Sequence, residues 1–295
     1  MEKSRWPVSV ADGLGYRPHA AVEGAHALAC VVEATPGTNL TVRIANHGQR
    51  QANSVMAEVY CVPVATLLTP ELWKRVGATE LVHVPAGHTV RVAATAIEGG
   101  PITHGGQCRY VALAGPKQPP QVPQGPPSFD WYAFCAFLRA YHNVAWRNVS
   151  IEENIPGPDE TVPYPFLLTN APDIHRRYNL EVVRNLPADV ELNLAVPLAL
   201  GREWIRQAPC TAVIDQKRDE LLLRVPTESR LVLRNVSLAA GARLPCRFVV
   251  RGSRQLQAGG YYFGLRQLFR NHAPEAIEVG AVWWEYLRKG GEGAG

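Results

Sequence analysis

The chain has 295 residues, of which 46% are hydrophobic and 19% charged, and its formal net charge is +4. This length exceeds a typical single core and suits two domains of common size, while the apolar fraction excludes a disordered chain. Residues 1–128 carry 10 basic and 8 acidic side chains, and residues 129–295 carry 20 and 18. Because neither half concentrates positive charge, we expect no nucleic-acid partner.

The cysteines indicate a reducing compartment. All six stand singly in the sequence, without a CxxC pair, so we interpret them as buried free thiols. Residues 1–13 contain no apolar core of a secretory signal, and no apolar run approaches the roughly 18 residues of a membrane helix. These patterns predict a cytoplasmic protein that does not insert into a membrane.

Residues 1–114 are predicted to form a first β-sandwich with an N-terminal arm. Residues 40–44 alternate apolar and polar side chains, and the turn Asn46-His47-Gly48 follows. Further short strands are expected at 55–62, 81–84, 90–92 and 107–113. Between them, Trp73 is expected to cover one end of the core, with a ligand platform as the sharper alternative. No alternating long helices suggest βαβ units, so antiparallel sheets are favoured.

Residues 115–143 are predicted to connect two domains. The stretch 115–128 holds six prolines, which favour an extended linker, and a groove-binding PxxP motif is the weaker interpretation. Phe129, Tyr132, Ala136 and Phe137 follow with helical spacing and predict a short helix whose aromatic side chains pack against a sandwich.

Residues 144–288 return to the strand pattern and are predicted to form a second sandwich of about seven to nine strands. The turns 184–189 and 239–243 separate candidate strands, and residues 289–295 form a loose tail that we expect to be disordered. Both halves contain an apolar strand, a turn of small residues with a glycine, and another alternating strand. The expected fold class is therefore all-β, with two immunoglobulin-like β-sandwich domains joined by a Pro-rich linker and a short helix.

Four segments carry a family resemblance: "ANHGQRQANSVMAEVYCVP" (45–63), "VHVPAGHTVRV" (82–92), "HGGQCRYVAL" (104–113) and "YHNVAWRNVSI" (141–151). In this order they resemble bacterial tandem immunoglobulin-like modules of the CARDB type, over roughly residues 38–250. His142 stands where such modules carry Asn, and His104 is separated from Cys108 by three residues rather than one. The resemblance implies a β-sandwich fold and a non-catalytic adhesive or accessory role.

The motifs of common enzyme classes are missing from the sequence, including G-x-S-x-G, H-E-x-x-H and the phosphate-binding glycine loops. We therefore expect no enzyme and no cofactor. A metal-dependent enzyme remains the weak alternative. His83, His88, His104 and Cys108 are its candidate ligands, of which two histidines and the cysteine would hold zinc and leave the fourth position open. Isolated turn histidines are the simpler interpretation.

A partner-binding surface is predicted on the second sandwich. In a strand, Arg247 and Arg251 share one face while Phe248 and Val250 point to the core, so the two arginines suit an acidic partner or a solvated face. Adjacent aromatic pairs must send one member outward and one inward. Exposed Tyr and Trp favour interfaces. The aromatic candidates are Tyr261, Tyr262, Trp283 and Trp284.

The segment 141–151 is interpreted as a joint between domains. Its alternate positions give two mixed faces, which suit an edge strand better than a central strand. His142, Trp146, Arg147 and Asn148 are the candidate joint residues. We predict a non-catalytic structural or adaptor protein that contacts a protein partner or assembles with itself. A subunit of a larger bacterial assembly is one form of this prediction. A carbohydrate or small-ligand module using loop aromatics such as Trp73 and Trp204 is the second hypothesis.

Overall fold

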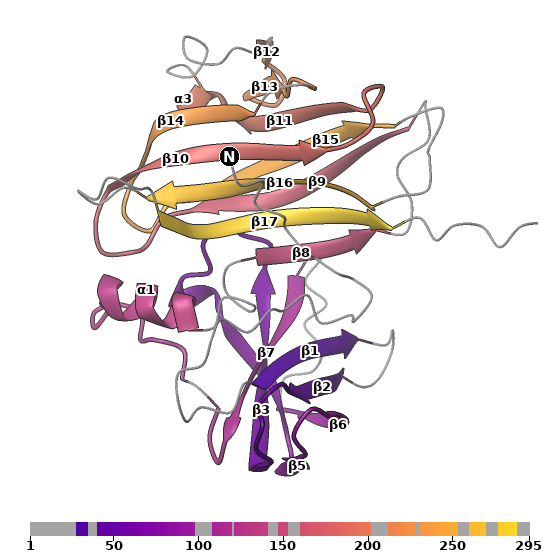
Figure 1. The fold of residues 1–295 in the computed structure, drawn as a ribbon. Helices are drawn as coiled ribbons and strands as arrows, with labels where there is room; N and C mark the ends of the chain where they lie inside the picture. The colour runs from indigo at the N-terminus through magenta and orange to yellow at the C-terminus, as the bar shows by residue number, and fades with distance from the viewer. Residues whose placement is uncertain are drawn as a thin grey trace, which may run out of the picture. The chain divides into compact units, whose positions relative to one another are not determined.

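The computed structural model describes residues 28–34, 40–97, 108–119, 121–140, 147–152, 160–201, 212–227, 230–252, 260–269 and 277–287. These residues form an almost entirely β structure, which confirms the predicted fold class (Figure 1). The chain divides into two compact units. The first unit comprises Met1–Val62 and Pro70–Pro123, and the second comprises Pro63–Thr69 and Gln124–Gly295. The predicted domain bounds, residues 1–114 and 144–288 with a connection at 115–143, stay a prediction.

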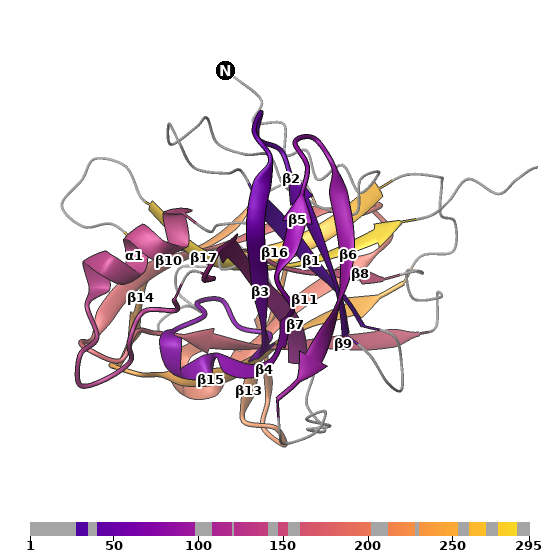
Figure 2. The same cartoon turned by 90° about the horizontal axis from the view of Figure 1, so that it is seen from below.

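The first unit is built from one sheet of seven strands in the order β1-β2-β6-β4-β3-β5, with β7 paired to β3. Strands β2, β3, β5 and β6 can be followed in Figure 2. Its strands, with a single turn of 3-10 helix η2, are β1 (Leu28–Ala34), β2 (Leu40–Asn46), β3 (Ala52–Pro63), η2 (Pro70–Leu72), β4 (Lys74–Thr79), β5 (Val82–Val84), β6 (Thr89–Ala96) and β7 (Cys108–Pro116).

Alternation of side chains explains the core of the first unit. In β2, Val42 and Ile44 are fully buried, and they pack with Val55 and Val59 of β3. Branched residues suit this pleated, half-buried surface. Trp73 packs edge-on against Tyr60, with ring centroids 5.4 Å apart. That contact matches the packing role expected for Trp73.

The second unit is a sandwich of two five-stranded sheets. The β9 sheet has the order β12-β13-β11-β15-β9, and the β17 sheet has the order β14-β10-β16-β17-β8. Figure 1 shows these sheets as two layers. Their strands are β8 (Arg147–Glu152), β9 (Thr161–Thr169), β10 (Arg176–Asn185), β11 (Glu191–Pro197), β12 (Ala212–Asp215), β13 (Glu220–Arg224), β14 (Leu231–Leu238), β15 (Arg243–Arg251), β16 (Gly260–Phe269) and β17 (Ile277–Leu287).

Aromatic rings join the two layers of this sandwich. Phe248 of the β9 sheet packs against Phe263 and Trp284 of the β17 sheet, with centroids 5.3 and 5.7 Å away. Tyr164 packs edge-on against Trp284, and the hydroxyl of Tyr286 donates to that of Tyr164 over 2.6 Å. Such ring pairs stabilise a core beyond simple burial. The second unit therefore has an aromatic centre, unlike the aliphatic core of the first.

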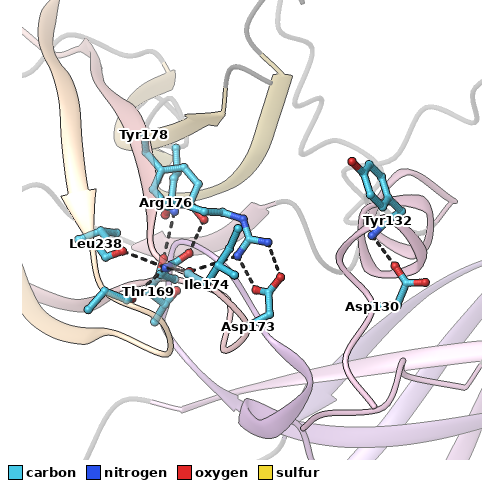
Figure 3. Close-up of polar contacts among 11 residues, drawn as sticks. Asp130, Tyr132, Thr169, Asp173, Ile174, Arg176, Tyr178 and Leu238 are labelled. Atoms are coloured by element: carbon cyan, nitrogen blue, oxygen red, sulfur yellow. Dashed lines mark hydrogen bonds and ion pairs between the residues drawn. The ribbon is translucent and has the colours of Figure 1, made fainter. Parts of the chain in front are cut away.

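The expected helix is present as α1 (Trp131–Ala140), and one further helical turn, α3 (Leu198–Gly201), follows β11. Asp130 caps α1, because its carboxylate accepts the N–H groups of Tyr132 and Ala133 (Figure 3). Phe134 is fully buried, whereas Tyr132 is exposed. Phe137 of the predicted stripe is buried as well, but Tyr132 and Ala136 are exposed, so that part of the prediction is wrong. The buried face is set by Phe134 and Phe137, three residues apart, and Phe129 lies before the helix begins.

Candidate functional site

The outer face of the β9 sheet carries the two predicted arginines. In β15, Cys246, Phe248 and Val250 are buried, so the alternation proposed for this strand is confirmed. Arg251 is exposed, whereas Arg247 is partly buried and forms an ion pair with Glu220 of β13 over 2.6 Å. The exposed charge of Arg251 is accessible to a partner, whereas the charge of Arg247 is already balanced by Glu220 within the sheet.

Strand β12 ends this sheet and exposes apolar side chains on both faces. Among the described strands, β12 pairs with β13 alone. Val213 is 59% exposed and its neighbour Ile214 is 48% exposed. Consecutive residues of a strand point to opposite faces. The β12–β13 hairpin therefore presents an apolar edge whose two faces both reach solvent.

The predicted aromatic surface requires a correction. Trp283 and Trp284 are both buried, at 7% and 1% exposed, so the expected outward tryptophan is wrong. Alternation does place them on opposite faces. Trp283, however, lies flat on the backbone of Gly264, where an added Cβ would approach its ring to 2.7 Å. A bare glycine thus gives the indole a place to pack.

The two tyrosines of the same prediction are partly exposed. Tyr262 packs edge-on against Trp283, with centroids 6.0 Å apart. Tyr261 lies opposite Tyr286 in the register of β16 and β17. Their role in partner binding stays a prediction, and the tyrosines rather than the tryptophans are the accessible members of the set.

The predicted joint falls partly outside the described residues, which include neither His142 nor Trp146. Arg147 and Asn148 begin β8, which pairs in parallel with β17 and lies at the end of the β17 sheet. The edge position expected for this segment is therefore confirmed, and its role as a joint stays a prediction.

The weak zinc alternative finds no convergent ligands within the described part of the chain. His83 and His88 are both exposed, and Nδ1 of His88 lies 2.8 Å from the carbonyl of Ala86. His104 lies outside the described residues. Cys108 begins β7.

No helix that the structure describes is long and apolar enough to span a membrane.

A polar cavity of about 720 Å³ opens beside the loop between β10 and β11, and the sequence patterns did not reveal it. Arg184, Asp189, Glu191 and Arg224 supply its charges. The guanidinium of Arg184 donates to the carbonyls of Val225, Pro187 and Val190. Burial, with a smaller contribution from the charge of Arg224, lowers the pKa of Arg184. The cavity is thus lined by charges of both signs.

Arg176, a buried arginine, begins β10 next to the loop between β9 and β10. Arg176 is 4% exposed and forms a bidentate pair with Asp173 at 2.5 and 2.6 Å (Figure 3). Its guanidinium also stacks 3.9 Å from the ring centre of Trp131. The charge of Arg176 is therefore balanced within the loop, whereas the neighbouring Arg177 is exposed. The guanidinium of Arg176 fixes the loop and the start of α1.

The fold defines an immunoglobulin-like, all-β class of protein. Among solved structures, the chain is similar to the N-terminal domain of PorA at 13% identity and a TM-score of 0.28, over 47% of this chain and 85% of that one. It is similar to the collagen adhesin CNA from S. aureus at 8% identity and a TM-score of 0.23, over 85% and 87%.

A putative membrane anchored protein from Corynebacterium diphtheriae gives 8% identity and a TM-score of 0.28, over 89% of this chain and 58% of that one. None of these three structures is described as a CARDB module. No protein-family model matches the sequence, and no curated protein matches it.

Proposed function

We propose that the protein is a non-catalytic structural or adaptor protein that binds an extended segment of a protein partner along β12. One observation carries this proposal, namely the apolar edge formed by Val213 and Ile214, which are both about half exposed or more. An exposed hydrophobic edge strand is a template for pairing with another chain. Backbone hydrogen bonds then supply affinity, and alternate side chains supply specificity.

The outer face of the same sheet supports a protein partner rather than a purely apolar ligand. Leu222 of β13 lies opposite Val213. The Arg247–Glu220 pair lies on the same sheet, and exposed Arg251 follows four residues after Arg247 in β15. Interfaces combine an apolar centre with a polar rim. A partner that adds a strand to β12 and covers the outer face of the sheet as far as β15 with acidic side chains would meet both kinds of surface.

Lysine substitutions at the edge test this function. The parent protein and the variants Val213→Lys and Ile214→Lys are each purified from the native host. The proteins that copurify with each are then compared by quantitative mass spectrometry. Leu81→Lys is the matched control, because Leu81 is 58% exposed but lies in the first unit. A partner lost at least about tenfold in the two edge variants and retained in the control is expected, from loss of hot-spot contacts. The same partners in all four samples would refute the proposal.

The cavity favours a second candidate, the binding of a small polar ligand. Its volume of about 720 Å³ falls within the usual range of ligand sites. Arg224 and Glu191 can bind groups of opposite charge, so a zwitterionic ligand matches it best. Screening amino acids and sugar acids by ligand-observed NMR, with Arg224→Ala as the comparison, tests this function. If Arg224→Ala leaves the binding of a ligand unchanged, the cavity is excluded as its binding site.

A further inference from the structure

A short segment from the middle of the first unit belongs to the second unit. The chain leaves the first unit after Val62, contributes Pro63–Thr69 to the second unit, and returns to the first at Pro70. The segment is separated by more than 90 residues of sequence from β9, its main neighbour. It is therefore a tertiary insertion and not a local turn.

The inserted segment is buried as deeply as a core strand. Val64 is 4% exposed, Thr66 is 1% exposed, and Ala65, Leu67 and Leu68 are fully buried. A solvent-exposed connection would not bury five consecutive residues, because loops normally run over the surface. The apolar side chains of the segment contribute to the core of the second unit.

Backbone pairing fixes the segment on the free edge of β9. The N–H of Thr66 donates to the carbonyl of Leu167 over 2.9 Å, and the N–H of Leu167 donates to the carbonyl of Val64 over 2.8 Å. Ala65 and Leu167 form a parallel bridge. The segment thus extends the β9 sheet beyond its last named strand.

Hydroxyl groups continue this pairing where the backbone ladder ends. Thr169 Oγ1 accepts the N–H of Leu67 over 3.0 Å and donates to the carbonyl of the same residue over 2.7 Å. The N–H of Thr169 donates to Thr66 Oγ1 over 3.2 Å. These buried bonds satisfy polar groups that would otherwise be costly to desolvate.

The opposite side of the segment lies against β17. A Cβ added to Gly280 would lie 1.8 Å from the carbonyl oxygen of Thr66 and 3.2 Å from Cα of Leu67. Only glycine permits this approach of two backbones. Gly280 therefore makes room for a peptide backbone between β9 and β17.

We propose that the space between β9 and β17 is a strand-acceptor site for an extended peptide, and that residues 63–69 of the same chain are its ligand. Recognition rests on pairing with the edge of β9, on Thr169, and on the absence of a side chain at Gly280. The site lies within the second unit, and its ligand is covalently continuous with the first unit at Val62 and at Pro70. Cutting the Pro-rich connection should therefore leave the two fragments associated.

Cleavage of the full-length protein tests this site. A specific protease site is placed at the exposed stretch 116–118, and the folded protein is cut there and examined by size exclusion with light scattering. We expect one particle containing both fragments. Thr169→Val keeps the side-chain volume and removes both hydroxyl bonds to Leu67, so it should raise the dissociation constant of the fragments at least about tenfold.

Gly280→Ala is the second variant, and it should separate the fragments still more readily. Gly125→Ala is the matched control, because nothing lies within 4 Å of its added Cβ. Circular dichroism of each cut variant reports whether the second unit stays folded. Fragments that separate in the parent protein overturn the proposal. Fragments that hold together equally well in the parent and Thr169→Val also overturn it.

Discussion

The two units share a corner built around a buried asparagine, Asn46 in the first and Asn170 in the second. Each is 1% exposed, and the side-chain Nδ2 of each donates to the carbonyl four residues later. Each also donates to the carbonyl at the end of a distant strand, that of Val84 or Leu238. In both corners that strand leads into a turn whose glycine has positive φ.

The strands around the two corners correspond as well. Strand β2 pairs with β6, and β9 pairs with β15. Strand β3 pairs with β5, and β10 pairs with β14. The backbone N–H of Asn46 donates to the carbonyl of His88, and that of Asn170 donates to the carbonyl of Ala242, one residue after each turn glycine. The small-residue turns noted in the sequence are therefore parts of the same asparagine-centred corner, which occurs in both units.

The corners differ in what satisfies the asparagine oxygen. Oδ1 of Asn46 accepts the N–H of Gly48, two residues away in the same loop. Oδ1 of Asn170 accepts the hydroxyl of Tyr178 in β10 over 2.6 Å. A local bond orders a turn, whereas a bond to a neighbouring strand joins the turn to the sandwich. The second corner is therefore more deeply coupled to its core.

The largest expected effect is the loss of the second asparagine. Asn170→Ala leaves the Tyr178 hydroxyl and the carbonyls of Leu238 and Ala239 without their partner, so we expect a loss of about 4 kcal/mol. Asn46→Ala should cost about 2 kcal/mol, because its bonds to Arg50 and Gly48 are local and only partly buried. Hydrogen exchange followed on peptides from each unit measures both. Equal losses in the two units would remove the distinction between the corners.

An intermediate effect is expected at the Arg176–Asp173 ion pair beside the loop between β9 and β10. Asp173→Asn leaves the buried Arg176 guanidinium without its carboxylate and should cost about 3 kcal/mol at pH 7. Burial raises the pKa of Asp173, but the hydrogen bond and charge of Arg176 outweigh it and leave that pKa below its usual value. The stabilisation is thus present above the ordinary carboxyl pKa and disappears as the pH falls through the lower, folded value.

Urea denaturation at several pH values measures this dependence. The difference between parent and Asp173→Asn should shrink as the pH falls below about 3.9, the usual pKa of an aspartate. Glu80→Gln, at an exposed position of the first unit, serves as the control. A difference that stays constant down to pH 2 would show that the carboxylate charge does not stabilise the loop.

Period-two alternation predicted much of this molecule, because it reports which face of a strand is buried. It placed Phe248 and Val250 inward correctly. It failed for Trp283, since alternation says that two neighbours face opposite ways but not that either face meets solvent. Trp283 is buried because Gly264, its partner in the adjacent strand, leaves room for the indole ring. That partner is set by strand register, which is a tertiary property.

The remaining features depend on contacts between distant parts of the sequence. Residues 63–69 begin with one proline and contain two threonines, and their burial follows only from pairing with β9 more than 90 positions later. Asn46 looked like an ordinary turn residue for the same reason, because Val84 is 38 positions away. Spacing reveals local geometry, whereas these bonds require the assembled sheets.

The smallest expected effect isolates the one bond by which the corners differ. Tyr178→Phe keeps the ring in contact with Phe269 and removes only the hydroxyl that donates to Asn170, so it should destabilise the second unit by about 1 kcal/mol. In an Asn170→Ala background the same substitution should cost less, because the hydroxyl has already lost its acceptor. A double-mutant cycle by urea denaturation measures this coupling. Additive losses would show that Tyr178 and Asn170 act independently, and the second corner would then be no more coupled to its sandwich than the first.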